Sequence, residues 1–89
     1  MAKKRRKLNK DFEKKIYSSK KNVELVLAKI YDIDDEDIQK EYMSAFNRVV
    51  YLYDQLKGDY EQHGFNDNSE KLLANYKNTF NLFESEFEI

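Results

Sequence analysis

Residues 35–60 read DEDIQKEYMSAFNRVVYLYDQLKGDY, and their apolar side chains recur at alternating steps of four and three. This spacing puts them on one face of an α-helix. One stripe consists of Ile38, Tyr42, Ala45, Val49, Leu52 and Leu56, and a second stripe beside it consists of Met43, Phe46, Val50, Tyr53 and Tyr60. Together the stripes cover about half of the helix circumference, which is more than one partner helix needs. We therefore expect a long central helix over about residues 35–62, with a helix on each side of it.

The sequences on either side of this segment predict those two helices, over about residues 9–32 and 69–87. The first carries an apolar face with the same spacing, made of Phe12, Ile16, Ser19, Val23, Val26 and Ile30. The last carries Leu72, Tyr76, Phe80, Phe83 and Phe87. Because the chain has no Pro, each helix can run long. The predicted fold class is all-α, a three-helix bundle-like arrangement in which residues 9–89 form a single domain.

Several polar residues mark where the helices are expected to begin and end. The expected N-caps are Asn9, then Asp34 or Asp35, then Asp67 (in a capping box with Glu70) or Ser69, and Gly64 is expected to end the central helix. Ser18 and Ser19 are mediocre helix formers. This pair is therefore a weak point of the first helix, and the sequence leaves open whether the helix bends or breaks there.

The charged residues are sorted along the chain. Residues 1–21 hold ten Lys and Arg against two acids, a net charge of +8, whereas residues 22–89 hold six basic residues against fifteen acids, a net charge of −9. Residues 1–8 are expected to form a flexible basic arm, because they contain too little apolar surface to order themselves. The residues predicted to bind nucleic acid or an acidic partner are Lys3, Lys4, Arg5, Arg6, Lys7, Lys10, Lys14, Lys15, Lys20 and Lys21.

This basic segment has three interpretations. It suits a phosphate backbone, which would make binding sensitive to salt, and it equally suits an acidic protein surface. It could also remain solvated, or lie against the acidic body of the same chain. The acidic body itself could present a phosphate-like surface to a nucleic-acid-binding protein, or simply be a solvated helix face.

A second group of residues is predicted to form a protein interface. The acids Asp34, Asp35, Glu36 and Asp37 cluster between the first two helices. Tyr17, Leu25 and Leu82 are apolar side chains that fall off the core faces of their helices. Large apolar side chains outside a core are frequent at binding surfaces.

Residues 27–38, LAKIYDIDDEDI, resemble part of a helix-turn-helix, with Ala28, Ile33 and Ile38 at its small and apolar positions. The resemblance implies a second helix that enters the DNA major groove. Asp32 replaces the usual turn Gly, and the four acids at 34–37 would face the phosphates and repel them. The charge pattern therefore disfavours DNA reading by this segment.

Residues 79–83, TFNLF, resemble the bacterial sliding-clamp peptide, in which Gln-Leu-x-Leu-Phe fills a hydrophobic pocket. The resemblance implies clamp binding. Here the leading Gln is absent and Phe80 replaces the first Leu. Phe80 and Phe83 also fall on the expected core face, so a structural role competes with clamp binding.

Composition narrows the classes of function. The chain has no Cys and one His, and it shows neither a Gly-rich phosphate loop nor a metal-binding pattern. No enzyme activity, metal or cofactor is therefore expected. The basic start is not followed by an apolar stretch, and no run of about 18 apolar residues occurs, so neither a signal peptide nor a membrane span is expected. The absence of Cys fits a cytoplasmic protein, and the Lys-, Asn- and Tyr-rich composition is common in AT-rich bacterial genomes and their phages.

These patterns predict a small regulatory or inhibitory binding protein that is encoded by a phage or mobile element. Its partner is expected to be a larger protein or protein–nucleic-acid complex. Two alternatives stay open: direct, largely non-sequence-specific binding of DNA or RNA by the arm and the first helix, and a structural assembly subunit. The wide apolar face of the central helix could also serve a homodimer.

Overall fold

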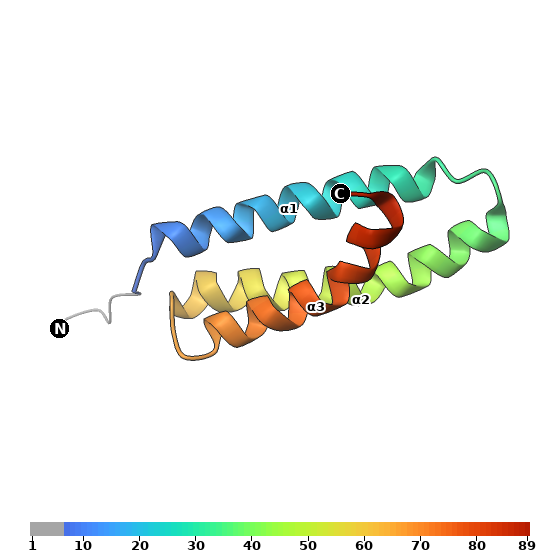
Figure 1. Ribbon diagram of the computed structural model, residues 1–89. Helices are drawn as coiled ribbons and strands as arrows, with labels where there is room; N and C mark the ends of the chain where they lie inside the picture. The colour runs from blue at the N-terminus through green and yellow to red at the C-terminus, as the bar shows by residue number, and fades with distance from the viewer. Residues whose placement is uncertain (1–6) are drawn as a thin grey trace.

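The computed structural model describes residues 7–89 of the chain. It contains three helices, α1 (Lys10–Tyr31), α2 (Glu36–His63) and α3 (Ser69–Phe87), joined by short turns (Figure 1). The helices pack against one another, and residues 7–89 form no strand, so the predicted all-α three-helix arrangement is confirmed. The molecule is elongated, with principal extents of 58 × 20 × 18 Å.

The helices run alternately up and down the long axis. α1 and α2 form an antiparallel hairpin, and α3 returns beside α2, against which it packs more extensively than against α1 (Figure 1). α3 ends before it reaches the α1–α2 turn (Figure 1). The beginning of α2 is therefore covered by α1 but not by α3.

Three of the expected helix boundaries are found. The Asn9 side chain accepts a hydrogen bond from the Phe12 N–H at 3.0 Å and caps α1. Asp35, rather than Asp34, caps α2, because its carboxylate accepts from the N–H groups of Asp37 and Ile38 at 2.9 and 3.2 Å. Gly64 ends α2 with a φ of 70°, a conformation that a residue without Cβ adopts at little cost.

The expected cap of α3 is wrong. Asn68 occupies the N-cap position without a side-chain cap bond, so Asp67 and Glu70 do not form the capping box and Ser69 is already the first helical residue. Asn66 organises this turn instead: its side chain accepts from the Asn68 N–H at 2.8 Å, and its own N–H donates to the Ser69 hydroxyl at 2.9 Å. A turn residue ahead of the helix thus takes over the capping role.

α1 does not break at Ser18 and Ser19, because it runs continuously from Lys10 to Tyr31. Ser19 is buried, and its hydroxyl donates to the Lys15 carbonyl at 2.8 Å, which satisfies it inside the helix. The Ser19 carbonyl in turn accepts from the Tyr76 hydroxyl of α3 at 3.2 Å. Tertiary contacts hold this turn where helix propensity alone is weak.

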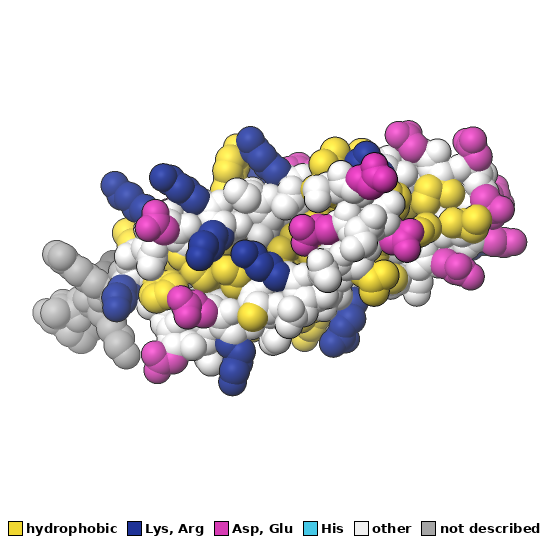
Figure 2. All heavy atoms as spheres, viewed as in Figure 1, with side chains coloured by type: hydrophobic (Ala, Val, Ile, Leu, Met, Phe, Trp, Pro, Cys, Tyr) yellow, Lys and Arg dark blue, Asp and Glu magenta, His cyan; other side chains and the backbone are white. Residues whose placement is uncertain are grey.

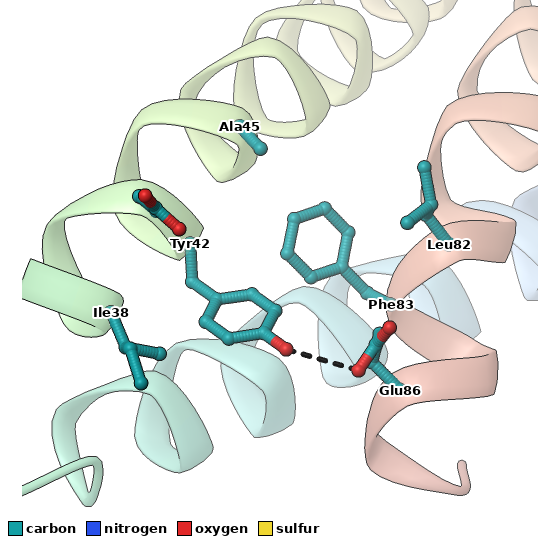
Figure 3. A pocket seen from close by; sticks show the side chains of 7 residues that line it. Ile38, Tyr42, Ala45, Leu82, Phe83 and Glu86 are labelled. Atoms are coloured by element: carbon teal, nitrogen blue, oxygen red, sulfur yellow. Dashed lines mark hydrogen bonds between the residues drawn. The ribbon is translucent and has the colours of Figure 1, made fainter. Parts of the chain in front are cut away.

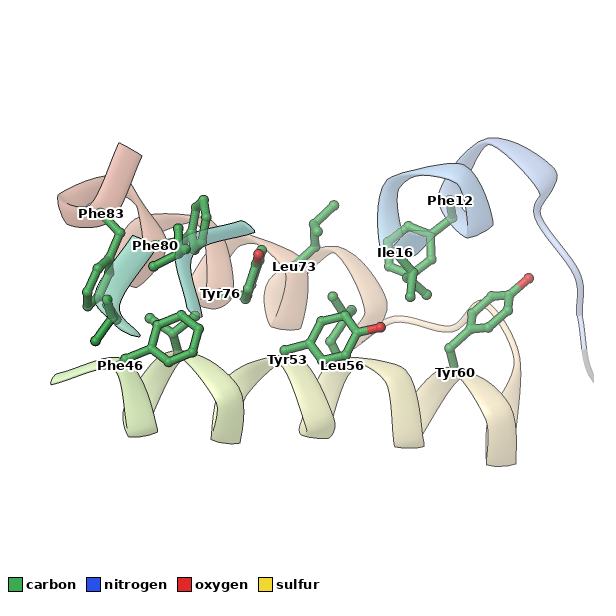
Figure 4. Close-up of a cluster of buried hydrophobic side chains, with 13 residues drawn as sticks. Phe12, Ile16, Phe46, Tyr53, Leu56, Tyr60, Leu73, Tyr76, Phe80 and Phe83 are labelled. Atoms are coloured by element: carbon green, nitrogen blue, oxygen red, sulfur yellow. The ribbon is translucent and has the colours of Figure 1, made fainter. Parts of the chain in front are cut away.

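Buried side chains from all three helices form one core (Figure 4). It is rich in aromatic rings that touch one another, such as Phe46 and Phe83, whose centroids lie 5.5 Å apart in an edge-on arrangement. Near the α2–α3 turn, Phe12 packs against both Tyr60 and Phe65. Large rings fill the core of a small chain efficiently, which explains much of the aromatic content.

The core draws on both expected stripes of α2. Its buried members are Phe46, Val49, Tyr53, Leu56 and Tyr60. Phe46, Tyr53 and Tyr60 of the second stripe are thus buried within the chain, whereas Met43 and Val50 are only partly buried. Ile38 and Ala45 are exposed, contrary to their expected place in the core, because they lie at an open groove between α2 and α3.

Candidate functional site

The predicted basic residues divide into those inside and those outside the described chain. Lys3, Lys4, Arg5 and Arg6 lie outside the described residues. Lys7 is joined to the α2–α3 turn, since its carbonyl accepts a hydrogen bond from the Phe65 N–H at 2.6 Å. Lys10, Lys14, Lys15, Lys20 and Lys21 are all exposed along the first half of α1. Lysines gather over this end of the molecule in Figure 2.

The predicted acidic residues lie at the opposite end. Asp34, Asp35, Glu36 and Asp37 are exposed around the α1–α2 turn, where acidic side chains cluster in Figure 2. Asp35 also has the structural task of capping α2. The side chain of Gln39 closes the turn by donating to the carbonyls of Ile30 and Tyr31 at 3.2 and 3.3 Å.

The acidic turn follows the end of α1, whereas Lys10 begins this helix, and its 22 residues span about 33 Å. The described basic and acidic surfaces therefore lie at opposite ends of the molecule.

Next to the acidic turn, α2 and α3 enclose an open groove of about 340 Å³ (Figure 3). Its lining residues are Ile38, Glu41, Tyr42, Ala45, Leu82, Phe83 and Glu86, and we call this set the α2–α3 groove. Leu82 is 68% exposed and Ile38 is 45% exposed, one on each wall. The floor of the groove is well packed, because Phe83 is buried and its ring packs against that of Tyr42.

The rim of the α2–α3 groove is acidic. Glu41 and Glu86 are exposed at its edges, and its lining residues include neither Lys nor Arg. The Tyr42 hydroxyl donates to the Glu86 carboxylate at 3.0 Å, which holds that carboxylate beside the apolar surface (Figure 3). This hydrogen bond is the main reason that the pKa of Tyr42 is raised from 10.0.

The structure brings together some of the predicted interface residues and separates others. Leu82 lies in the α2–α3 groove near the acidic turn. Tyr17 and Leu25 lie on α1 and are 59% and 45% exposed, outside that groove. The Lys21 ammonium lies 4.9 Å from the Tyr17 ring centroid, a cation–π contact within the chain.

Sequence reasoning missed the contribution of Ile38, Tyr42 and Ala45 to this surface. They share the spacing of the central helix with truly buried residues, and this spacing does not show which of them the other helices cover. The four acids just before Ile38 were the available signal, because a helix start so rich in charge is rarely covered on every side.

Neither family resemblance is supported by the packing. Residues 27–38 form the antiparallel α1–α2 turn, whereas the helices of a helix-turn-helix cross at about 90–120° (Figure 1). In the segment that resembles the clamp peptide, Phe80 and Phe83 are 2% and 4% exposed. These two rings cannot fill a partner's pocket while they remain in the core.

Within residues 7–89, no group of three or more His, Cys, Asp or Glu side chains is arranged to hold a metal ion. In the same part of the chain, none of the helices combines the length and the apolar character that crossing a bilayer requires. Comparison with known protein families, with curated proteins and with solved structures found no match to this chain.

Proposed function

We propose that this protein is a small, non-enzymatic regulatory or inhibitory binding protein that docks a larger partner through the α2–α3 groove. The observation that carries the proposal is an open apolar groove with a purely acidic rim. The segment that fits it is an apolar helix face flanked by Lys or Arg. Such a segment would bury the exposed Leu82 and Ile38 and place its own charges beside Glu41 and Glu86.

Charge and burial play different parts in this docking. The apolar contacts supply most of the affinity, at about 25 cal/mol for each Å² removed from water. The acids of the rim and of the adjacent turn attract basic partners and reject acidic ones. The basic end of the molecule, around the first half of α1, then contacts a second, acidic part of the same macromolecular assembly.

A pair of synthetic peptides tests directly whether the protein prefers a basic helix to an acidic one. Both are amphipathic helices of about four turns, one made of Leu and Lys and the other of Leu and Glu. Fluorescence anisotropy of the labelled peptides is measured against the full chain. We expect the Leu/Lys peptide to bind at least about tenfold more tightly, since a difference of about 1.4 kcal/mol is enough for that ratio.

Two matched variants locate the binding site. Ile38→Lys adds a positive charge to the α2–α3 groove, and Leu25→Lys adds the same charge to a residue of equal exposure on α1, since both side chains are 45% exposed. We expect Ile38→Lys to weaken binding of the Leu/Lys peptide by about tenfold or more and Leu25→Lys to leave it nearly unchanged. Equal losses in the two variants, or equal affinity for the Leu/Glu peptide, would contradict the proposal.

A further inference from the structure

A second groove, independent of the first, lies between α1 and α3. It has a volume of about 360 Å³, and we call it the α1–α3 groove. Its lining residues are Lys14, Lys15, Ser18, Ser19, Asn22, Tyr76, Lys77, Phe80 and Glu84. Figure 2 shows lysine side chains over the region where α1 and α3 lie side by side.

Lysines stand on both walls of this groove. Lys14 and Lys15 come from α1, and Lys77 comes from α3. All three are exposed, and none has a carboxylate at ion-pair distance within residues 7–89. Because side chains of both helices line the same groove, the lysines of its two walls can reach the same chain of phosphates from opposite sides.

The rest of the lining suits a phosphate backbone rather than bases. Ser18 and Asn22 add a hydroxyl and an amide that can donate to phosphate oxygens. The rings of the floor, Tyr76 and Phe80, are each only 2% exposed. Bases therefore find no exposed aromatic ring on which to stack. Such stacking is the usual source of base contacts in single-strand binding.

The two ends of the α1–α3 groove also differ in charge. Glu84 is the only acid among the lining residues, and it lies two turns beyond Lys77 on α3. It repels phosphates from that end. In the other direction the lysines continue to Lys10 at the start of α1 and to Lys7 before it, next to the basic sequence of residues 3–6.

We infer that the α1–α3 groove binds the phosphodiester backbone of a single-stranded nucleic acid, without reading its bases. Lys14, Lys15 and Lys77 neutralise its phosphates from two sides, and Lys10 and Lys7 extend the track toward the N-terminus. Lys77 gains this role only through folding, since its neighbours in sequence carry no positive charge. A single strand fits between the walls, whereas a duplex meets only their tops.

The test uses the full chain and labelled oligonucleotides of about 20 nucleotides, as single strand and as duplex. A triple variant, Lys14→Gln/Lys15→Gln/Lys77→Gln, removes the charges of the groove. The matched control, Lys40→Gln/Lys57→Gln/Lys71→Gln, removes the same charge at exposed positions that do not line it. Circular dichroism checks that both variants fold, which the exposure of all six lysines favours.

Binding is measured by anisotropy at several salt concentrations. We expect the intact chain to prefer the single strand, and the groove variant to bind it roughly tenfold or more weakly. The slope of log K against log salt should become shallower by about 2, since each phosphate contact on a single strand contributes about 0.7. The control variant should keep both the affinity and the slope close to those of the intact chain.

Three results would overturn the inference. The first is equal loss of affinity in the groove and control variants, which would indicate a response to net charge alone. The second is equal or tighter binding of the duplex, and the third is no binding by the intact chain. None of these results bears on the α2–α3 groove, which is probed with peptides.

Discussion

Tyr76 and Ser19 join α3 to α1: the Tyr76 hydroxyl donates a hydrogen bond to the Ser19 carbonyl across 3.2 Å, although the two residues are 57 positions apart in sequence. The Tyr76 ring also packs against Tyr53 and Phe80. This contact holds the turn of α1 that the sequence marks as a weak point. It also sets the spacing of the two helices that form the α1–α3 groove.

Alkaline pH is expected to weaken the fold through Tyr76. Burial raises the pKa of its phenol from 10.0 to about 12. The unfolded chain therefore loses this proton near pH 10.0, whereas the folded chain keeps it until about pH 12. Its contribution to the free energy of unfolding is complete below pH 10.0 and declines as the pH rises through that interval, by up to about 1.4 kcal/mol per pH unit.

The variant Tyr76→Phe separates the ionisation of Tyr76 from that of the other titratable groups. At about pH 7 we expect the variant to be less stable by about 1 kcal/mol, because the hydrogen bond to Ser19 is lost. At about pH 11 the difference should shrink or reverse, because Phe does not ionise. Tyr53, whose pKa burial also raises, is present in both proteins. Urea denaturation at the two pH values measures the difference, and an unchanged difference would contradict the assigned pKa.

The two glycines of the chain should respond in opposite directions to substitution by Ala. Gly58 lies inside α2, and a Cβ added there meets no atom within 4 Å. Gly58→Ala should therefore stabilise the fold by roughly 0.5–1 kcal/mol. Gly64 ends α2 with a φ of 70°, so Gly64→Ala should destabilise it by about 1–3 kcal/mol. Thermal unfolding of both variants measures the two changes in stability. Two changes of the same sign would contradict the prediction.

The cap of α2 can be tested with neighbouring acids. Asp35→Ala removes the carboxylate that accepts from the N–H groups of Asp37 and Ile38, and should cost about 1 kcal/mol of stability. Asp34→Ala removes an equal charge from an exposed residue outside the cap and should change stability by less than about 0.5 kcal/mol. Chemical denaturation compares the two. If Asp34→Ala costs as much, the acids act through charge rather than through the cap.

The helices could be predicted from the sequence because local signals agree with one another. Apolar spacing predicted the buried face of each helix. Asn9 correctly predicted the start of α1, and Gly64 correctly predicted the end of α2. The cap of α3 escaped prediction because the polar residues 66–69 offer several competing hydrogen-bonding patterns, and only the packed turn selects Asn66.

The candidate sites depended on information that spacing does not contain. Periodicity placed Ile38 on the apolar face of α2, but it does not show which part of that face the other helices cover, and Ile38 is exposed. Lys77 gave no signal in sequence, because it becomes part of a basic groove only when α3 lies beside Lys14 and Lys15. Leu82 could be recognised, since it departs from the core face of its own helix.

The most direct test of docking is a nuclear magnetic resonance footprint of the Leu/Lys peptide on the ¹⁵N-labelled full chain. The proposal predicts saturable shift changes centred on residues 38–45 of α2 and 82–86 of α3, which contain the lining of the α2–α3 groove. The amides of the Leu25 face should barely move. Changes spread evenly over the acidic surface, or centred away from these two segments, would contradict the claim that this groove is the docking site.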